Sequence, residues 1–357
     1  MVISMKFTKS ELEQKAAEAI RACLEDVPLV KIKGLEMERD FKGCRADLVT
    51  TVTTPTGTTR FLVAEIKATG EPRVAREALN QLWRNWANQP DVVPVFIAPY
   101  ISPKSAEICK QDNTGYMDLA GNCRLVLDNV FIEREGRPNP FSEKRDLQSL
   151  YSPKASRVVR VLLSNPGSVW KVQDLATEAE VSLGLVANVK KSLEDREWIQ
   201  KTEKGLLLRE PEKLLAEWAE NYSFRKNTTR DFFSLKAVAD LEADLAKVCV
   251  ENKWRYALTG FSASARLAPA IRSPRTMVYV ENISNELILS LGLKEVTSGA
   301  NVTLLEPYDA GVFYGTKEID GVYVASAVQI YLDLRGFRGR GEEAAAKLLD
   351  EVIRPRW

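Results

Sequence analysis

From Arg45 to Lys67 the chain reads RADLVTTVTTPTGTTRFLVAEIK. Two apolar, β-branched runs flank a Thr-rich turn that contains one proline and one glycine, which predicts a β-hairpin. Because side chains alternate between the two faces of a strand, Glu65 and Lys67 share one face of the second strand. Asp47 lies on the neighbouring strand. The pattern therefore predicts that two carboxylates and one ammonium group meet at one end of the hairpin.

These three side chains suit metal-assisted hydrolysis of a phosphodiester. Carboxylate oxygens are the hard ligands that Mg²⁺ prefers, and the ion keeps water molecules that can be activated as nucleophiles. A lysine beside the ion can orient or deprotonate that water, or stabilise the charge that develops on phosphorus. The same residues also fit a solvated hairpin edge without a catalytic role, and the residues alone leave both interpretations open.

The order of the surrounding helices and strands restricts the choice of fold. The expected elements are helices at 10–24 and 73–89, a buried strand at 92–98 and a short helix at 103–111. With the hairpin they follow the order α-β-β-β-α-β. This order, with Asp47 and the Glu65-x-Lys67 motif on adjacent strands, resembles the PD-(D/E)xK nuclease-like superfamily over residues 8–135.

The resemblance implies a restriction-endonuclease-like α/β domain over residues 1–138. It implies that Asp47 and Glu65 hold Mg²⁺, that Lys67 is the catalytic lysine, and that Gln81 on the second helix belongs to the same catalytic site. Members of this superfamily either cut nucleic acid or keep the fold without the chemistry. The resemblance therefore leaves open whether this domain cleaves nucleic acid with Mg²⁺ or holds it without cutting.

Two positions differ from the pattern of that superfamily. Ala46 stands where the motif has a proline, and Asn85 stands four residues after Gln81, where some members carry an aromatic residue. The segment Gly115–Asn122 is in turn similar to one that some members carry late in the domain.

The composition excludes several kinds of site. The 357 residues include no histidine, which rules out Ser-His-Asp triads, Cys-His pairs and histidine zinc sites. The 5 cysteines are scattered and odd in number, as expected for reduced thiols in a cytoplasmic protein, and they argue against structural zinc. The net charge of +1 means that any contact with nucleic acid depends on local patches. No apolar run approaches the ~20 residues of a membrane span.

Residues 150–210 have the pattern of a winged helix-turn-helix domain. Helices are expected at 154–163, 172–179 and 183–196, and extended segments at 168–170, 198–202 and 205–208. Ser182 is a suitable N-cap for the third helix. A helix, a short strand, a helix-turn-helix and a terminal hairpin are together typical of a winged helix, whose third helix enters the major groove of DNA.

One face of that third helix is expected to be buried and the other to contact DNA. The residues expected in the core are Leu183, Val186, Val189 and Leu193. The residues expected to face DNA are Ser182, Gly184, Asn188, Lys190 and Lys191 of the helix, and Lys201 and Lys204 of the hairpin. Asn188 could address an adenine edge, and the lysines could contact phosphates. Winged helices also dock onto proteins, so double-stranded DNA and a protein partner both remain open.

The remaining residues, 211–357, predict a third α/β domain. Helices are expected at 211–223, 235–252, 328–334 and 341–353, strands at 276–280 and 300–305, and a hairpin at 311–315. The turn Gly260–Ser262 between a strand and a helix is similar to the opening of a nucleotidyltransferase, but the strand Thr276–Val280 lacks the carboxylates which that chemistry needs. The residues expected to be surface charges in turns are Asp309, Glu318 and Asp320.

Three segments after the winged helix resemble the AbiEi-type antitoxins of type IV toxin–antitoxin systems, over residues 152–357. They are Tyr256–Gly260, Asn301–Pro307 and Val328–Leu334. The resemblance implies a bacterial transcriptional regulator whose winged helix binds an operator. It also implies that the C-terminal domain counters a nucleotidyltransferase-type toxin.

The sequence thus predicts three modules: a nuclease-like domain (1–138), a winged helix (150–210) and a C-terminal α/β domain (211–357). The function expected is that of a DNA-binding regulator of the AbiEi antitoxin type. Two alternatives remain: a Mg²⁺-dependent DNA endonuclease that the winged helix targets, and a protein-interaction adaptor without a nucleic-acid role. A homodimer is compatible with each of them.

Overall fold

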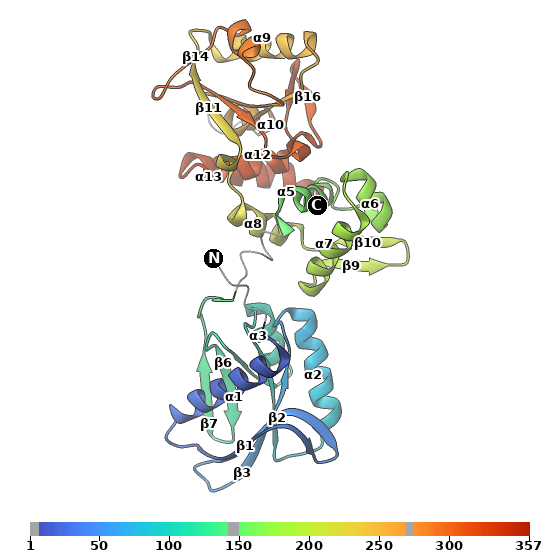
Figure 1. Cartoon of the computed structure of the whole chain (residues 1–357), viewed down its shortest axis with the longest axis vertical. Coiled ribbons are helices and arrows are strands. Elements are labelled where there is room, and N and C mark those ends of the chain that lie inside the picture. Colours follow the sequence, from blue (N-terminus) through green and yellow to red (C-terminus); the bar gives the residue numbers. More distant parts are fainter. Residues whose placement is uncertain (1–6, 142–149, 269–274) are drawn as a thin grey trace. The chain divides into compact units, whose positions relative to one another are not determined.

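The computed structural model describes residues 7–141, 150–268 and 275–357 (Figure 1). The chain forms two compact units. One unit comprises Met1–Arg145 with Glu194–Glu197, and the other comprises Asp146–Leu193 with Trp198–Trp357. Both units combine helices with β-sheets, so the class is mixed α/β, as the sequence predicts.

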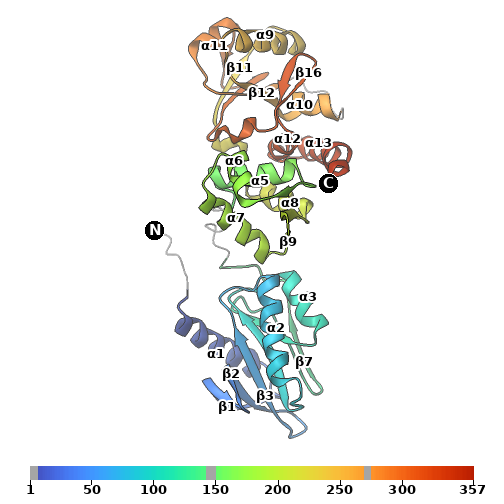
Figure 2. The ribbon, with the colours of Figure 1, turned by 90° about the vertical axis from the view of Figure 1, so that its right-hand side faces the viewer.

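The N-terminal unit is built on a 7-stranded sheet whose strands lie side by side in sequence order. The strands are β1 (Lys31–Phe41), β2 (Cys44–Thr53), β3 (Thr59–Ile66), β4 (Val92–Ala98), β5 (Gly115–Asp118), β6 (Cys123–Leu127) and β7 (Val130–Arg134). β3, β4 and β5 run parallel, and the other neighbours are antiparallel. Helix α1 (Lys9–Glu25) packs on one face, and α2 (Pro72–Trp86) and α3 (Pro103–Gln111) pack on the other (Figure 1, Figure 2).

The helices of this unit begin where local chemistry favours a start. Thr8 and Glu11 form a capping box ahead of α1, in which each side chain accepts a hydrogen bond from the other residue's backbone N–H. Pro72 opens α2, where its missing N–H costs nothing. The central strands β3 and β4 carry nearly continuous apolar runs because helices cover both faces of the sheet.

Four strands of this sheet were not located by residue from the sequence. β1 is an edge strand that is mostly exposed and rich in charged residues, which discourage pairing with a further strand. Its apolar alternation is correspondingly weak. β5, β6 and β7 are 4, 5 and 5 residues long, and β6 and β7 alternate between buried and more exposed positions.

The second unit begins with three helices and a 3-stranded sheet of order β8-β10-β9. The elements are α5 (Pro153–Ser164), β8 (Val169–Trp170), α6 (Val172–Glu178), α7 (Leu183–Asp195), β9 (Ile199–Thr202) and β10 (Gly205–Leu208). All six lie at the positions expected from the sequence. The Ser182 hydroxyl accepts a hydrogen bond from the Leu185 N–H at 3.3 Å, so the predicted cap of α7 is present.

One residue predicted for the core of α7 is on the surface. Val186, Val189 and Leu193 are buried, whereas Leu183 is 53% exposed. Leu183 is the first residue of the helix, and helical side chains lean toward the helix N-terminus. Its side chain therefore lies over the exposed turn that precedes α7, and the prediction that it joins the core is wrong.

The rest of the second unit contains a mixed 7-stranded sheet of order β14-β11-β15-β13-β12-β17-β16. Its strands are β11 (Thr228–Phe233), β12 (Tyr256–Thr259), β13 (Thr276–Val280), β14 (Lys294–Glu295), β15 (Val302–Glu306), β16 (Lys317–Ile319) and β17 (Val322–Val324). Its helices are α8 (Pro211–Asn221), α9 (Val238–Glu251), α10 (Gly260–Leu267), α11 (Asn285–Ser290), α12 (Ala327–Leu334) and α13 (Arg340–Leu348). Two further turns follow, at Leu349–Ile353 and Arg354–Arg356.

The hairpin predicted at residues 311–315 is wrong. Ala310–Phe313 form a single 3-10 turn, which begins where the Asp309 carboxylate accepts a hydrogen bond from the Gly311 N–H at 2.8 Å. The hairpin lies further on, between β16 and β17. Its turn residues are Asp320 and Gly321, with φ of 52° and 76°. An Asp-Gly pair tolerates this left-handed backbone and is a strong hairpin signal.

A single hydrophobic core runs through the described part of the second unit, from Leu150 to Ile353. The segment 150–210 and the C-terminal domain are therefore packed together within one body. Arg160 of α5 is buried in this core, where its guanidinium donates a hydrogen bond to the Gln329 side chain of α12. The same guanidinium lies 5.0 Å from the centre of the Trp218 ring, in a cation–π contact.

Gln329 belongs in turn to a buried polar network around Asp333. The Asp333 carboxylate accepts hydrogen bonds from the Tyr222 hydroxyl at 2.7 Å, the Tyr279 hydroxyl at 2.9 Å and the Gln329 amide at 3.0 Å. It also accepts one from the Thr259 hydroxyl. Burial raises the pKa of Asp333, and these donors oppose the shift. The contacts give Asp333 a structural role in holding α12 against the sheet.

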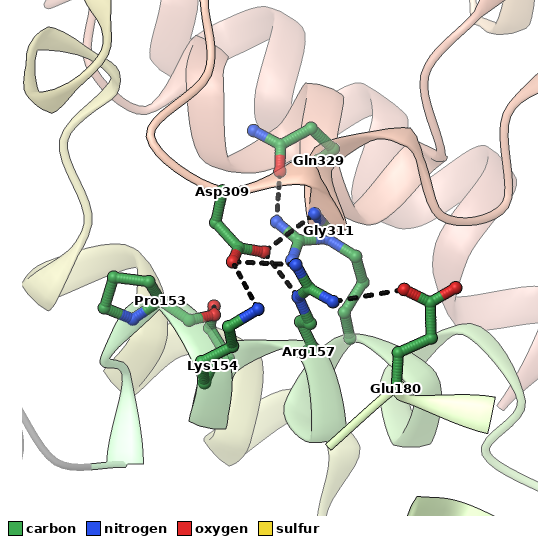
Figure 3. A network of polar contacts seen from close by, with 9 residues as sticks. Pro153, Lys154, Arg157, Glu180, Asp309, Gly311 and Gln329 are labelled. Atoms are coloured by element: carbon green, nitrogen blue, oxygen red, sulfur yellow. Dashed lines mark hydrogen bonds and ion pairs between the residues drawn. The ribbon is translucent and has the colours of Figure 1, made fainter. Parts of the chain in front are cut away.

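Figure 3 shows a second polar contact between α5 and the C-terminal domain. Arg157 donates two hydrogen bonds to Asp309, at 2.7 and 3.0 Å, and its remaining terminal nitrogen lies 3.2 Å from Glu180. Lys154 approaches the same aspartate at 3.9 Å. The Asp309 side chain is only 8% exposed, so the prediction that it is a surface charge is wrong: it is committed to a partner 152 residues earlier in the chain.

We expect the Arg157→Met variant to lower the free energy of unfolding of the second unit by about 3 kcal/mol, because it strands a nearly buried carboxylate. Urea unfolding monitored by circular dichroism measures this loss. Glu180→Gln is the matched control, since Glu180 is 81% exposed and its loss is expected to change stability by less than about 0.5 kcal/mol. Equal effects of the two variants would contradict the assigned role of the Arg157–Asp309 pair.

Candidate functional site

The four residues predicted for catalysis come from three neighbouring elements of the N-terminal unit. Asp47 lies in β2, Glu65 lies next to the end of β3, Lys67 directly follows β3, and Gln81 lies in α2. β2 pairs with β3 so that Leu48 faces Ala64. Asp47 therefore lies beside Glu65 across the pair, as the hairpin pattern predicts.

The structure brings these four side chains together. The Lys67 ammonium lies 2.6 Å from the Glu65 carboxylate and donates a longer hydrogen bond, of 3.4 Å, to the Gln81 side-chain oxygen. The Asp47 carboxylate accepts a hydrogen bond from the Ile66 N–H at 2.8 Å. This last contact fixes the aspartate to the strand that carries Glu65.

Burial sets the electrostatics of this cluster. Glu65 is 3% exposed, and the loss of solvation raises the pKa of its carboxyl above the usual 4.5. The negative charge of Asp47 raises this pKa further, whereas the hydrogen bond and the positive charge of Lys67 lower it. The site thus holds two carboxylates that repel each other and one cation that partly compensates them, which is an environment that favours a bound cation.

The two carboxylates of Asp47 and Glu65 suit Mg²⁺ better than a metal ion whose ligands must all come from the protein. Among the residues that the structure describes, no three His, Cys, Asp or Glu side chains are grouped to hold a metal ion. Mg²⁺ commonly binds through one or two carboxylates and keeps several waters. Asp47 and Glu65 could hold it in that way.

A buried aspartate of the segment Gly115–Asn122 lies at the same edge of the sheet. Asp118 ends β5, and since β3, β4 and β5 are parallel, their carboxyl ends meet at one edge. Asp118 accepts hydrogen bonds from the Ile101 N–H at 3.2 Å and from the backbone and side chain of Asn122 at 2.8 and 2.9 Å. These contacts fasten the two loops that follow β4 and β5, so Asp118 shapes this edge.

The residues predicted to face DNA are accessible. Ser182, Gly184, Asn188 and Lys191 on α7 and Lys201 and Lys204 on the β9–β10 hairpin are exposed, and Lys190 is half-buried. The core side of α7 is formed by Val186, Val189 and Leu193. The structure thus separates a buried and a polar side of the helix.

The C-terminal domain lacks the carboxylate pair of a nucleotidyltransferase on its central strand. All five residues of β13, Thr276–Val280, are buried and none is acidic. Asp333, a buried acid of this domain, is engaged in the structural network described above.

The C-terminal part of the chain is similar to a known family. Residues 207–354 match a family described as a transcriptional regulator, AbiEi antitoxin, of type IV toxin–antitoxin systems. The match covers most of the segment in which the sequence predicted this resemblance. A comparison with curated proteins finds no match.

Solved structures that are similar to part of this chain include EndoMS bound to double-stranded DNA and a repair endonuclease from Pyrococcus abyssi. The first is 12% identical, with a TM-score of 0.23, and the similarity covers 32% of this chain and 46% of the other. The second is 13% identical, with a TM-score of 0.22, over 30% and 46% of the two chains. The chain thus spans less than half the length of either. Within the described ranges, none of the helices combines the length and apolarity needed to cross a membrane.

The pKa of Glu65 offers a test of the cluster. We expect Asp47→Asn to lower this pKa because a neighbouring negative charge is removed, and Lys67→Met to raise it because the stabilising cation is lost. A ¹³C NMR titration of the Glu65 carboxyl measures both shifts, with the wild-type midpoint expected above 4.5. Shifts in the same direction, or none, would contradict the electrostatic roles assigned to Asp47 and Lys67.

Proposed function

We propose that the protein is a DNA-binding transcriptional regulator of the AbiEi antitoxin type. The observation that carries this proposal is the match of residues 207–354 to that family. A regulator needs a module that reads DNA, and the segment 150–210 precedes the matched region and shares its hydrophobic core. An antitoxin also needs a toxin, for which the resemblance suggests a nucleotidyltransferase-type protein that the C-terminal domain would bind.

The segment 150–210 is proposed to be a winged helix, with α7 as the recognition helix. Three helices, a three-stranded sheet and a β9–β10 hairpin with an exposed turn support this assignment. Asn188 would pair with an adenine edge, because its amide offers both a donor and an acceptor. Lys190, Lys191, Lys201 and Lys204 would contact phosphates, which fix the position of the helix on the duplex.

We expect the full chain to bind duplex DNA taken from upstream of its own coding sequence, with an affinity that falls steeply as salt rises. Lys191→Met and Lys204→Met should each weaken binding and lower the slope of log affinity against log salt by about 1. Fluorescence anisotropy measures both quantities. Lys294→Met is the control, since Lys294 is an exposed lysine on β14 and is not proposed to touch DNA.

Affinity that does not depend on salt would rule out phosphate contacts. The segment 150–210 would then be better explained as a protein-docking module, and the chain as an adaptor.

A second candidate function, Mg²⁺-dependent cleavage of nucleic acid, rests on the contact of Glu65, Lys67 and Gln81 beside Asp47. Asp47 and Glu65 would hold the ion, which would supply an activated water and charge stabilisation. Lys67, held at 2.6 Å from Glu65, would orient that water or stabilise the negative charge on phosphorus. Gln81 would keep the lysine side chain in place. The winged helix would then deliver the site to DNA.

A cleavage assay on single- and double-stranded DNA and RNA with Mg²⁺ or Mn²⁺ tests this activity. We expect Lys67→Ala to reduce cleavage at least about 100-fold, because it removes a group that stabilises the transition state. Lys104→Ala, which removes an exposed lysine of α3 outside the cluster, serves as the control. Absence of metal-dependent cleavage with every substrate would leave a domain that holds nucleic acid without cutting it.

A further inference from the structure

A cavity of about 410 Å³ lies inside the second unit, where the segment 150–210 meets the C-terminal domain. Its wall is formed by the ends of α5 and α6 on one side, and by β16, β17, α12 and the last turns of the chain on the other. The volume falls within the range of ~300–1,000 Å³ that is typical of ligand sites. Neither the proposed DNA contacts nor the Asp47–Glu65 cluster uses it.

Most of the cavity wall is apolar. Leu163 at the end of α5, Val324 of β17 and Val328 of α12 are buried residues that contribute to it, and the Trp357 ring closes one side. The Trp357 indole N–H approaches the Leu163 carbonyl at 3.5 Å, a long and weak contact. Such a wall suits a planar or aliphatic body, because burial of apolar surface drives its binding.

The polar part of the wall holds one group that lacks a partner. The Tyr314 hydroxyl donates to Glu178 at 2.8 Å and accepts from the Asn165 side chain at 3.1 Å, so these three residues satisfy one another. The Ser164 hydroxyl, by contrast, is buried and has no hydrogen-bond partner in the described part of the chain. A buried polar group without a partner is costly, and rotation of the Ser164 side chain, which lines the cavity, would turn the hydroxyl toward a ligand atom and remove that cost.

Two cations complete the cavity. Lys317 of β16 and Arg356 of the last turn line it and are exposed, so the cavity reaches solvent beside them. Across residues 7–141, 150–268 and 275–357, neither of them forms an ion pair. Glu178, the carboxylate in the wall, is engaged by Tyr314. The mouth of the cavity therefore carries positive charge that a ligand could neutralise.

We propose that this cavity binds a small amphipathic anion, with its apolar body against Leu163, Val328 and Trp357 and its carboxylate between Lys317 and Arg356. After rotation about its Cα–Cβ bond, the Ser164 hydroxyl would hydrogen-bond to the ligand. Since α5 and α6 belong to the segment proposed to bind DNA, occupancy would also change the affinity for DNA. This second statement rests on the proposed function, whereas the binding site does not.

Isothermal titration calorimetry on the full chain tests the site, with indole-3-acetate and octanoate as anionic probes and indole-3-acetamide as the neutral match. We expect saturable 1:1 binding of at least one anionic probe and weaker binding of the amide. Lys317→Met should weaken the anion about tenfold, which corresponds to the loss of one charge-assisted contact. Lys294→Met is the matched control, because Lys294 lies on the strand at the opposite edge of the same sheet.

Ser164→Val is the second variant, expected to weaken binding while leaving the Lys317 contact in place. Lack of binding by both anionic probes, or equal affinities in wild type and Lys317→Met, would overturn the proposal. The same titration with duplex DNA present tests the coupling. Anion binding in a chain that does not bind DNA would refute the regulator function while leaving the cavity site intact, so the two failures can be told apart.

Discussion

The second unit depends on a buried positive charge, the Arg160 guanidinium, which donates a hydrogen bond to the Gln329 amide oxygen. Removing a guanidinium from water is costly, and burial alone lowers the pKa of Arg160. The cost is offset by the Gln329 oxygen and by the face of the Trp218 ring. Gln329 can hold this position because its amide group is bound in turn to Asp333 and to two tyrosine hydroxyls. The first helix of the segment 150–210 and the centre of the C-terminal sheet are therefore parts of one polar network.

The same principle, at a smaller scale, organises the N-terminal unit. Glu65 is almost fully buried beside Asp47, and the Lys67 ammonium offsets the cost of burying its carboxylate there. In both units a polar group inside the structure is retained with specific partners, although an apolar residue would cost less. The difference lies in access. Arg160 is sealed in the core, whereas Lys67 remains 30% exposed and Asp47 is half-buried, so the Glu65 cluster can meet a ligand.

The sequence predicted those parts of the structure that local chemistry determines. Periodicity and turn residues predicted the positions of the capped or proline-initiated helices, of the hairpin that carries Asp47 and Glu65, and of the α5–β10 segment.

The predictions at Leu183, Asp309 and residues 311–315 were wrong because each outcome depends on distant residues or on a competing local turn. Asp309 is buried by Arg157, which lies 152 positions away, and no pattern near Asp309 reports this. The Asp320-Gly321 pair is itself a turn signal, and the hairpin lies there, between β16 and β17. Strands β1 and β11 lack a clear alternation because one is a charged edge and the other is half-exposed.

The candidate site was predictable only as a set of residue types on one face. The sequence could bring Asp47, Glu65 and Lys67 to one end of a hairpin, because a strand repeats every two residues. It could not predict how deeply the Glu65 side chain is buried, because this burial depends on the packing of α2 over the sheet. Nor could it predict Asp118, whose partners lie on two separate loops.

The two sheets differ in how their strands follow the chain, and this has a consequence for biosynthesis. In the N-terminal sheet each strand pairs with the next one in sequence, so every pairing can form as soon as the second strand has left the ribosome. In the second sheet the order is β14-β11-β15-β13-β12-β17-β16, and the shared core includes residues as late as Ile353. Pairings between distant strands close large loops and form slowly. The N-terminal unit can therefore be complete before the C-terminal helices that bury Arg160 of the segment 150–210 have been made.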